Sequence, residues 1–142
     1  MPDTAKSTPE SPGSLPDSPV STTHAQGGDP LTPARRARGR EVEFMARDLL
    51  RSRGYHVIQS AQSHLPDLVA WRPHEHLLLV QAKRPRTPLL PAGVAGQYEQ
   101  ELAALRRIPL PFRATVQLWT WTKRDGWRFF DVFRGGICEV KE

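Results

Sequence analysis

The chain has 142 residues and a formal net charge of +5, and this length is sufficient for one modest globular domain. Residues 1–34 carry one basic side chain against four acidic ones. Residues 35–142 carry 19 basic against 11 acidic, a net charge of +8 that favours a polyanionic partner, most often nucleic acid. The lone Cys138 excludes an intramolecular disulfide and a cysteine-rich zinc site, and no apolar run approaches the length of a membrane span.

The N-terminal segment differs in composition from the rest of the chain. Residues 1–34 hold seven of the fourteen prolines, with Ser, Thr, Gly and Asp between them. Such a segment cannot bury enough apolar surface to offset its ordering entropy, so we expect a disordered tail whose partner is unknown. We expect the folded domain to span residues 35–142. Because the first residues lack the charged and apolar regions of a signal peptide, a soluble cytoplasmic protein is expected.

The folded part begins with a basic cluster and a helix. The cluster consists of Arg35, Arg36, Arg38 and Arg40, and forms either a solvated linker or an arm that contacts phosphates. From Gly39 the pattern becomes helical, because apolar residues follow at i, i+3, i+4, i+7 and i+8: Val42, Met45, Ala46, Leu49 and Leu50. Gly54 is expected to end this helix in the C′ position.

The remaining pattern predicts strands and a second helix. Apolar runs bounded by turn residues predict three strands, at 55–59, 66–71 and 76–83. A second helix is expected roughly over 92–107. Two further strands, 115–121 and 127–133, form a hairpin around the Asp125-Gly126 turn signal. The order predicts an α/β fold with a mixed central sheet flanked by helices.

Polar side chains interrupt two of these strands where a purely structural sequence would not need them. Asp67 opens an otherwise apolar strand, and Gln81 and Lys83 lie two residues apart in the next one, so both point to the same face. If the turn takes five residues, 72–76, Asp67 pairs directly with Gln81. Glu43 lies on the flank of the first helix's apolar stripe, from which it can reach the sheet. We expect these four side chains to converge.

A carboxylate, an amide oxygen and an ammonium group at one place suit phosphodiester hydrolysis with Mg²⁺, for which Mn²⁺ can substitute. Lys83 would orient or deprotonate the attacking water, or offset developing negative charge. Each residue alone has a plainer interpretation. A Pro-Asp pair is usually a turn, Lys83 is typical of an edge strand, and Glu43 is typical of a solvated helix face, where Glu41 competes with it.

These residues resemble a known family. Pro66-Asp67, thirteen intervening residues and Gln81-Ala82-Lys83 resemble the signature of the PD-(D/E)XK nucleases, with glutamine in place of the acidic residue. The resemblance extends over roughly residues 38–133. It implies a restriction-endonuclease-like αβββαβ core.

The stretches before this signature resemble one branch of the family. Gly39 to Glu43, the helix-ending Gly54 and the loop from Ser60 to Ser63 resemble the archaeal Holliday junction resolvases. The VRR-type nuclease domain is a close second, because Pro66-Asp67 and the run Gln81-Ala-Lys-Arg-Pro85 are similar to its core.

The resemblance implies a role for each matching position. Glu43 would bind the metal directly or through water, Asp67 would be the central ligand, and Gln81 would offer its amide oxygen beside the Ala82 carbonyl. Lys83 would be the catalytic lysine, and Ser63 would match the loop serine of the resolvase site. Because Gln81 is neutral, metal affinity should be lower than with an acidic residue. Contacts to DNA are expected from Arg38, Arg40, His64, Arg84 and Arg86.

The sequence therefore predicts a Mg²⁺-dependent DNA endonuclease, similar to Holliday junction resolvases and serving DNA recombination or repair. A branched DNA has two symmetric scissile phosphates, so a resolvase would be a C2 homodimer, with the apolar surface of the last hairpin as the candidate interface. Two alternatives remain. One is a nuclease of the same fold that cuts flaps, ends or a recognition sequence. The other is a catalytically weak or inactive DNA-binding module.

Overall fold

The computed structural model describes residues 32–61 and 65–141. These residues lie in the second of the two units into which the chain divides, Met1–Pro30 and Leu31–Glu142. Almost all of the tail predicted over residues 1–34 therefore lies outside the described residues. Within the described ranges, no helix combines the length and the apolar character needed to cross a membrane.

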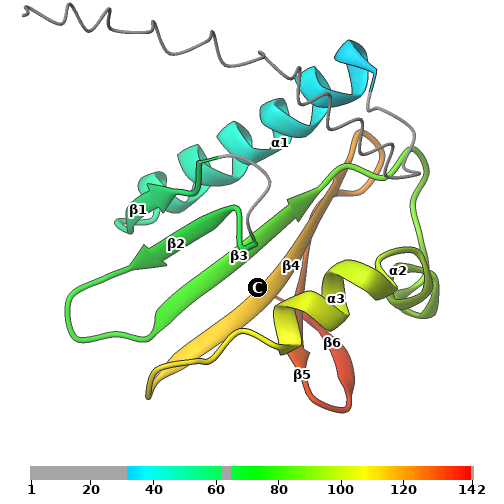
Figure 1. The fold of residues 1–142 in the computed structure, drawn as a ribbon. Helices are drawn as coiled ribbons and strands as arrows, with labels where there is room; N and C mark the ends of the chain where they lie inside the picture. The colour runs from blue at the N-terminus through cyan, green and yellow to red at the C-terminus, as the bar shows by residue number, and fades with distance from the viewer. Residues whose placement is uncertain (1–31, 62–64, 142) are drawn as a thin grey trace, which may run out of the picture. The chain divides into compact units, whose positions relative to one another are not determined.

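The described residues form a mixed α/β structure (Figure 1). Its elements are α1 (Pro33–Ser52), β1 (His56–Gln59), β2 (Leu68–Trp71), β3 (Leu77–Lys83), α2 (Pro91–Gln97), α3 (Glu99–Arg106), β4 (Ala114–Thr122), β5 (Gly126–Phe133) and β6 (Gly136–Val140). The six strands form one sheet in the order β1 to β6. Only β3 and β4 are parallel neighbours, and α2 and α3 make the crossover between them. The predicted αβββαβ core with a mixed sheet is confirmed.

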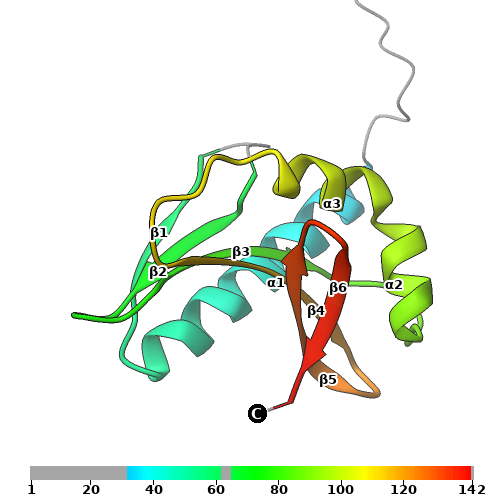
Figure 2. The ribbon, with the colours of Figure 1, turned by 90° about the horizontal axis from the view of Figure 1, so that it is seen from below.

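Helices cover both faces of the sheet (Figure 2). Helix α1 packs on β1, β2 and β3, whereas α2 and α3 pack on β6 and β5 from the opposite face. Two apolar clusters follow from this layering, because successive strand residues point to opposite faces. Leu50, Val80 and Trp119 belong to the cluster on the α1 side, and Leu102 and Phe130 to the cluster on the α3 side.

Helix α1 begins earlier than the expected start at Gly39. It starts at Pro33, and the Thr32 hydroxyl accepts a hydrogen bond from the Arg35 backbone N–H at 3.4 Å. Threonine at the N-cap with proline in the first turn is a helix-start signal. The arginine cluster therefore lies on the exposed first turns of α1, which excludes the linker, one of the two alternatives, whereas contact with phosphates stays a prediction. The helix ends as predicted, with Gly54 at φ +84° just beyond it.

Two other elements differ from expectation. The single helix predicted over 92–107 is two helices, which meet at Tyr98 with φ −110° and ψ 28°. Gly93 and Gly96 weaken the helical continuity of this segment, because glycine has a low helix propensity. Strand β6 was not predicted. Its partner strand, β5, is joined to it by a turn at Arg134-Gly135, and the segment is too short to give a clear alternating pattern.

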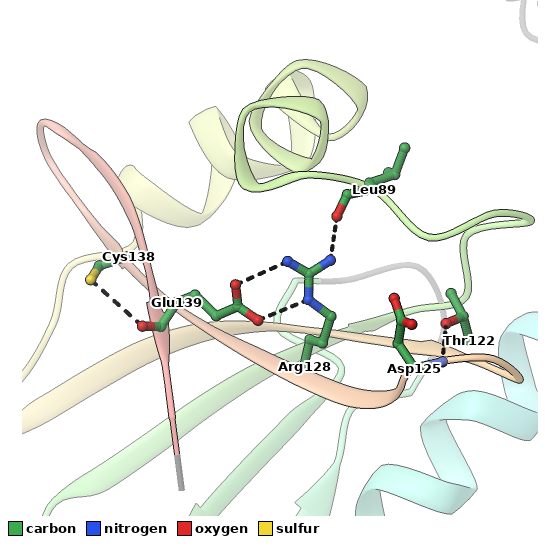
Figure 3. A network of polar contacts seen from close by, with 6 residues as sticks. All are labelled: Leu89, Thr122, Asp125, Arg128, Cys138 and Glu139. Carbon is green, nitrogen blue, oxygen red and sulfur yellow. Dashed lines mark hydrogen bonds and ion pairs between the residues drawn. The ribbon is translucent and has the colours of Figure 1, made fainter.

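An arginine on β5 ties the last hairpin to the chain that follows β3 (Figure 3). The Arg128 guanidinium donates to both carboxylate oxygens of Glu139, at 2.8 and 2.9 Å, and its Nη1 donates to the Leu89 carbonyl. The hydrogen bond from Arg128 lowers the pKa of Glu139. This contact fixes the β3–α2 connection against β5 and β6, and so holds the crossover helices in place.

Removing the charge of Glu139 is expected to destabilise the fold. Glu139→Gln should lower the free energy of unfolding by about 1–2 kcal/mol at pH 7, because it leaves the mostly buried Arg128 without its bidentate partner. Since the folded-state pKa of Glu139 is lowered, this stabilisation is present above the ordinary pKa of 4.5 and is lost as the pH falls further. Urea unfolding at pH 7 and pH 3 measures both effects.

The exposed ion pair of Arg72 with Glu75, at 2.6 Å, is the matched control for this prediction. Glu75→Gln is expected to change the free energy of unfolding by less than about 0.5 kcal/mol, because solvent screens the pair. Equal losses in the two variants would show that the contact in Figure 3 contributes no more than a surface pair.

Candidate active site

The β2–β3 hairpin brings two of the predicted residues opposite each other. Its register pairs Leu68 with Val80 and Ala70 with Leu78. Continued by one residue, the same register places Asp67 opposite Gln81. The connection between the strands takes the residues 72–76, as the predicted pairing required.

Asp67 is held by two hydrogen bonds at the start of β2. Its Oδ2 accepts from Gln81 Nε2 at 2.8 Å and from the Ala82 backbone N–H at 2.9 Å. The backbone on its other side is also fixed, because the Ser60 N–H donates to the Asp67 carbonyl at 2.8 Å and the Ser60 hydroxyl donates to the Pro66 carbonyl at 2.6 Å. These contacts fix the position of the carboxylate through Oδ2. Its other oxygen, Oδ1, takes no part in them.

Gln81 is the most unusual polar residue of the site. Its side chain is only 3% exposed. Its Nε2 bonds to Asp67, which leaves Oε1 as the one buried side-chain oxygen or nitrogen without a hydrogen-bond partner among the described residues. A buried oxygen without a donor costs free energy, so such an atom needs an explanation.

The pKa of Asp67 is raised from 3.8 to about 6. Burial is the largest cause, and the nearby Glu43 carboxylate raises the pKa further. The Ala82 N–H, Lys83 and Gln81 act in the opposite direction without cancelling these effects. The neighbouring donors and Lys83 therefore do not fully offset the cost of burying the ionised carboxylate. A cation beside the carboxylate would stabilise it.

Glu43 approaches the site from α1. It is half-buried on the flank of the stripe in which Val42 and Ala46 are buried. Gln59 of β1 donates from Nε2 to Glu43 Oε2 at 3.4 Å, which links the helix to the edge of the sheet. The negative charge of Glu43 is also one of the causes that raise the pKa of Asp67.

Lys83 lies on the same face of β3 as Gln81, and its contacts lead to α3. Its Nζ is 3.4 Å from Glu101 Oε1 and 5.9 Å from the centre of the Tyr98 ring. Sequence reasoning missed Glu101. The signal was present, because Tyr98, Glu101, Leu102 and Leu105 follow the i, i+3, i+4, i+7 pattern, which places an acidic residue within a buried stripe.

The predicted DNA-contacting arginines lie on two elements. Arg38 and Arg40 are exposed on the first half of α1, and Arg86 is exposed after β3. Arg84 is half-buried, with its guanidinium 2.5 Å from Glu41 of α1 and 4.6 Å from the centre of the Trp121 ring. The predicted roles of Ser63 and His64 remain predictions, because both residues lie outside the described part of the chain.

The site residues fit a hard divalent cation. Among the described residues, no three His, Cys, Asp or Glu side chains lie together as a metal site. The candidate set instead joins the Asp67 and Glu43 carboxylates to the Gln81 amide. The unpartnered Oε1 of Gln81 and the raised pKa of Asp67 are both what an oxygen-binding cation would correct. The Ala82 carbonyl also faces Asp67, because the N–H and C=O of one strand residue point to the same neighbouring strand.

A hollow lies on the α1 side of the sheet, the face opposite to Asp67, Gln81 and Lys83. It has a volume of about 670 Å³ and lies between the C-terminal end of α1 and strands β4 to β6. Leu50, Arg53, Trp119 and Asp131 are among its lining residues. None of the predicted site residues lines it.

No protein-family model matches the chain, and no curated protein sequence matches it. Among solved structures the chain is similar to Hjc, a Holliday junction resolvase from the archaeal hyperthermophile Archaeoglobus fulgidus. The two share 23% sequence identity over 74% of this chain and 84% of that chain, with a TM-score of 0.46. A similarity of this size assigns neither an activity nor site residues to this chain.

Proposed function

We propose that the chain is a metal-dependent DNA endonuclease that hydrolyses phosphodiester bonds. One observation carries the proposal: Asp67, Gln81 and Lys83 lie on one face of the β2–β3 hairpin, and the amide oxygen of Gln81 is buried without a partner among the described residues. Buried side-chain oxygens in a purely structural role are nearly always hydrogen-bonded, so the unsatisfied oxygen supports a ligand at this place.

The residues divide the chemistry between them. Asp67, Glu43, the Gln81 amide oxygen and the Ala82 carbonyl would hold Mg²⁺ or Mn²⁺. When bound, such an ion polarises a phosphoryl oxygen and lowers the pKa of a bound water. Lys83, which α3 holds beside this set, would stabilise the charge that develops on the phosphate or orient the attacking water.

The basic side chains support DNA as the substrate. Arg38 and Arg40 on α1 and Arg84 and Arg86 after β3 would contact phosphates on either side of the scissile bond. A four-way junction is the substrate that we favour, because of the motif pattern of the sequence. Paired cuts in such a junction need two copies of the site, related by a twofold axis, and hence a homodimer.

One observation favours a second candidate, a DNA-binding module without activity. Gln81 Nε2 donates to Asp67, and an amide can make this bond without any metal. An acidic residue at this position would instead require a cation or a shared proton. In that case the basic surface would remain and the hydrolytic site would be vestigial.

Cleavage of an end-labelled four-way junction, beside a linear duplex of the same sequence, tests the proposal. In Mg²⁺ or Mn²⁺ the wild-type chain should cut the junction, and Asp67→Ala should lower the rate at least about 100-fold, because it removes the central ligand. Asp48→Ala, at an exposed aspartate of α1, is the matched control and should cut at the wild-type rate.

The pattern of products separates the candidates. Paired symmetric nicks in the junction alone would support a resolvase. Cuts in both substrates would support a nuclease without junction preference. Tight DNA binding without metal-dependent cleavage, equal in wild type and Asp67→Ala, would contradict the proposal and support the binding module.

A further inference from the structure

The contacts of Lys83 extend the candidate site to α3. The Lys83 ammonium is 3.4 Å from Glu101 Oε1 and 5.9 Å from the centre of the Tyr98 ring. Both partners come from the crossover segment between β3 and β4. These contacts therefore hold the lysine from the side of the sheet on which α3 lies, opposite to α1.

The pair is partly shielded from solvent. The exposed fractions of the Lys83 and Glu101 side chains are 28% and 34%. Tyr98 is buried beneath them at 7% exposure. Charges in such a position are screened less than fully exposed charges, and a cation over an aromatic ring is further stabilised. Burial, and in second place the negative charge of Glu101, raise the pKa of Tyr98 to about 12.

In this arrangement Glu101 would compete with a DNA phosphate for contact with Lys83. A phosphate bound beside Asp67 and Gln81 would lie next to Lys83, which is two residues further along the same strand face. The phosphate and the Glu101 carboxylate are both negative, and both need the Lys83 ammonium as their partner. Because like charges this close repel, they cannot both lie against it without cost.

We infer that Glu101 and Tyr98 are positioning residues for Lys83, and that a DNA phosphate takes the place of Glu101 on the lysine when the substrate binds. Glu101 holds the ammonium against the Tyr98 ring in the free protein, so the lysine is already in place when the phosphate arrives. This inference rests on the proposed function for the catalytic use of Lys83. The exchange itself requires only DNA binding.

The exchange can be tested without catalysis by a double-mutant cycle. Binding of a fluorescein-labelled four-way junction is measured in EDTA and low salt for wild type, Glu101→Gln, Lys83→Met and the double variant. Glu101→Gln should tighten binding about 3-fold, because it removes a competitor for Lys83. In the Lys83→Met background, the same substitution should change binding less than about 1.5-fold.

A matched control separates this effect from a general change in charge. Glu99→Gln alters the same charge on the same helix at an exposed position. It should change binding only slightly, and equally in both backgrounds. If Glu101→Gln behaves as Glu99→Gln does, or tightens binding equally with and without Lys83, the inference is wrong.

Cleavage at saturating DNA supplies the second readout. Glu101→Gln should cut about 10-fold more slowly while binding more tightly, and this split between rate and affinity would not follow from a loss of stability. Tyr98→Leu removes the ring over which the ammonium lies and should also cut more slowly. A rate for Glu101→Gln equal to that of wild type would contradict the positioning role.

The failures of the two proposals are distinguishable. If wild type does not cut but the binding cycle shows the coupling, the nuclease proposal fails and the exchange on Lys83 stands. If wild type cuts and the cycle shows no coupling, the nuclease proposal stands and the role of Glu101 fails. Thermal unfolding of each variant identifies any that is not folded.

Discussion

Replacing Gln81 with glutamate is expected to make the stability of the protein depend on a divalent cation. Gln81 Nε2 lies 2.8 Å from Asp67 Oδ2, so the substitution would set two carboxylates at this distance in a buried place. Without metal, Gln81→Glu should lower the free energy of unfolding at pH 7.5 by about 3 kcal/mol, because the two groups repel or must share a proton.

A cation should reverse this loss. A ligand that binds only the folded state at about 100 times its Kd adds about 2.7 kcal/mol to the free energy of unfolding. Mg²⁺ or Mn²⁺ should therefore restore most of the stability of Gln81→Glu and bind it more tightly than wild type. Thermal unfolding with increasing Mn²⁺, beside a titration in EDTA, measures both effects.

The opposite face of the sheet offers a matched control. Gln117 Nε2 donates to Asp131 Oδ1 at 2.7 Å, so Gln117→Glu also sets a carboxylate against an aspartate. Asp67 and Gln81 lie on the other face of the sheet, so neither can join a cation bound by this pair. Gln117→Glu should be destabilised with no rescue by cation. Equal rescue of both variants would show that any pair of carboxylates suffices, and absence of rescue in Gln81→Glu would contradict a metal site at Asp67.

Replacing Asp67 with asparagine is expected to abolish cleavage and at the same time to stabilise the fold. The amide oxygen of asparagine can still accept from Gln81 Nε2 and the Ala82 N–H, so both hydrogen bonds are kept. The negative charge that burial disfavours is removed. The free energy of unfolding at pH 7.5 should rise by about 2 kcal/mol in metal-free buffer.

The pH dependence identifies the cause of this gain. In the folded state Asp67 keeps its proton up to a pKa of about 6, whereas in the unfolded state it loses the proton near 3.8. Between these values the folded state binds more protons, so the stability of wild type falls as the pH rises from about 4 to about 6. The advantage of Asp67→Asn should be absent below pH 4 and complete above pH 7.

Urea unfolding across this pH range, with Asp48→Asn as the exposed control, measures the prediction. The control should show no difference from wild type that changes over this window. If Asp67→Asn is less stable than wild type at pH 7.5, its partners compensate the Asp67 charge fully. Such a site would have little electrostatic need for a cation.

Features that depend on neighbouring residues in the sequence were predicted best. The pairing of Asp67 with Gln81 follows from strand alternation and the length of one turn, both of which are local. The end of α1 follows from Gly54 alone. The side on which Gln81 and Lys83 lie follows from their spacing of two residues. The functional roles given to these residues remain predictions.

Features that depend on packing between distant elements were not predicted. The contact of Glu101 with Lys83 arises only when the crossover helices pack on the sheet, so neither residue alone indicates it. The break at Tyr98 has the same origin, since the buried ring lies where α2 and α3 meet. The unpartnered oxygen of Gln81 is a property of its surroundings, which a strand pattern does not specify.

The parallel pairing of β3 with β4 has a consequence for the order in which the site is built during folding. Every described candidate ligand lies between Glu43 and Ala82, and the Asp67–Gln81 contact closes only a short hairpin, so it costs little loop entropy. The strand that covers the other side of β3 comes later, since Gln81 pairs with Leu118 of β4 across the α2–α3 crossover.

Pairing across such a crossover is intrinsically slower than hairpin formation. The ligand set is therefore expected to assemble first in a water-exposed state, and the burial that raises the pKa of Asp67 is completed only when the later elements pack on β3. At pH 5 the chain should then take up a proton late in refolding, at the step that closes the sheet. The ligands are encoded in the first part of the domain, and the environment that tunes them is encoded in the last.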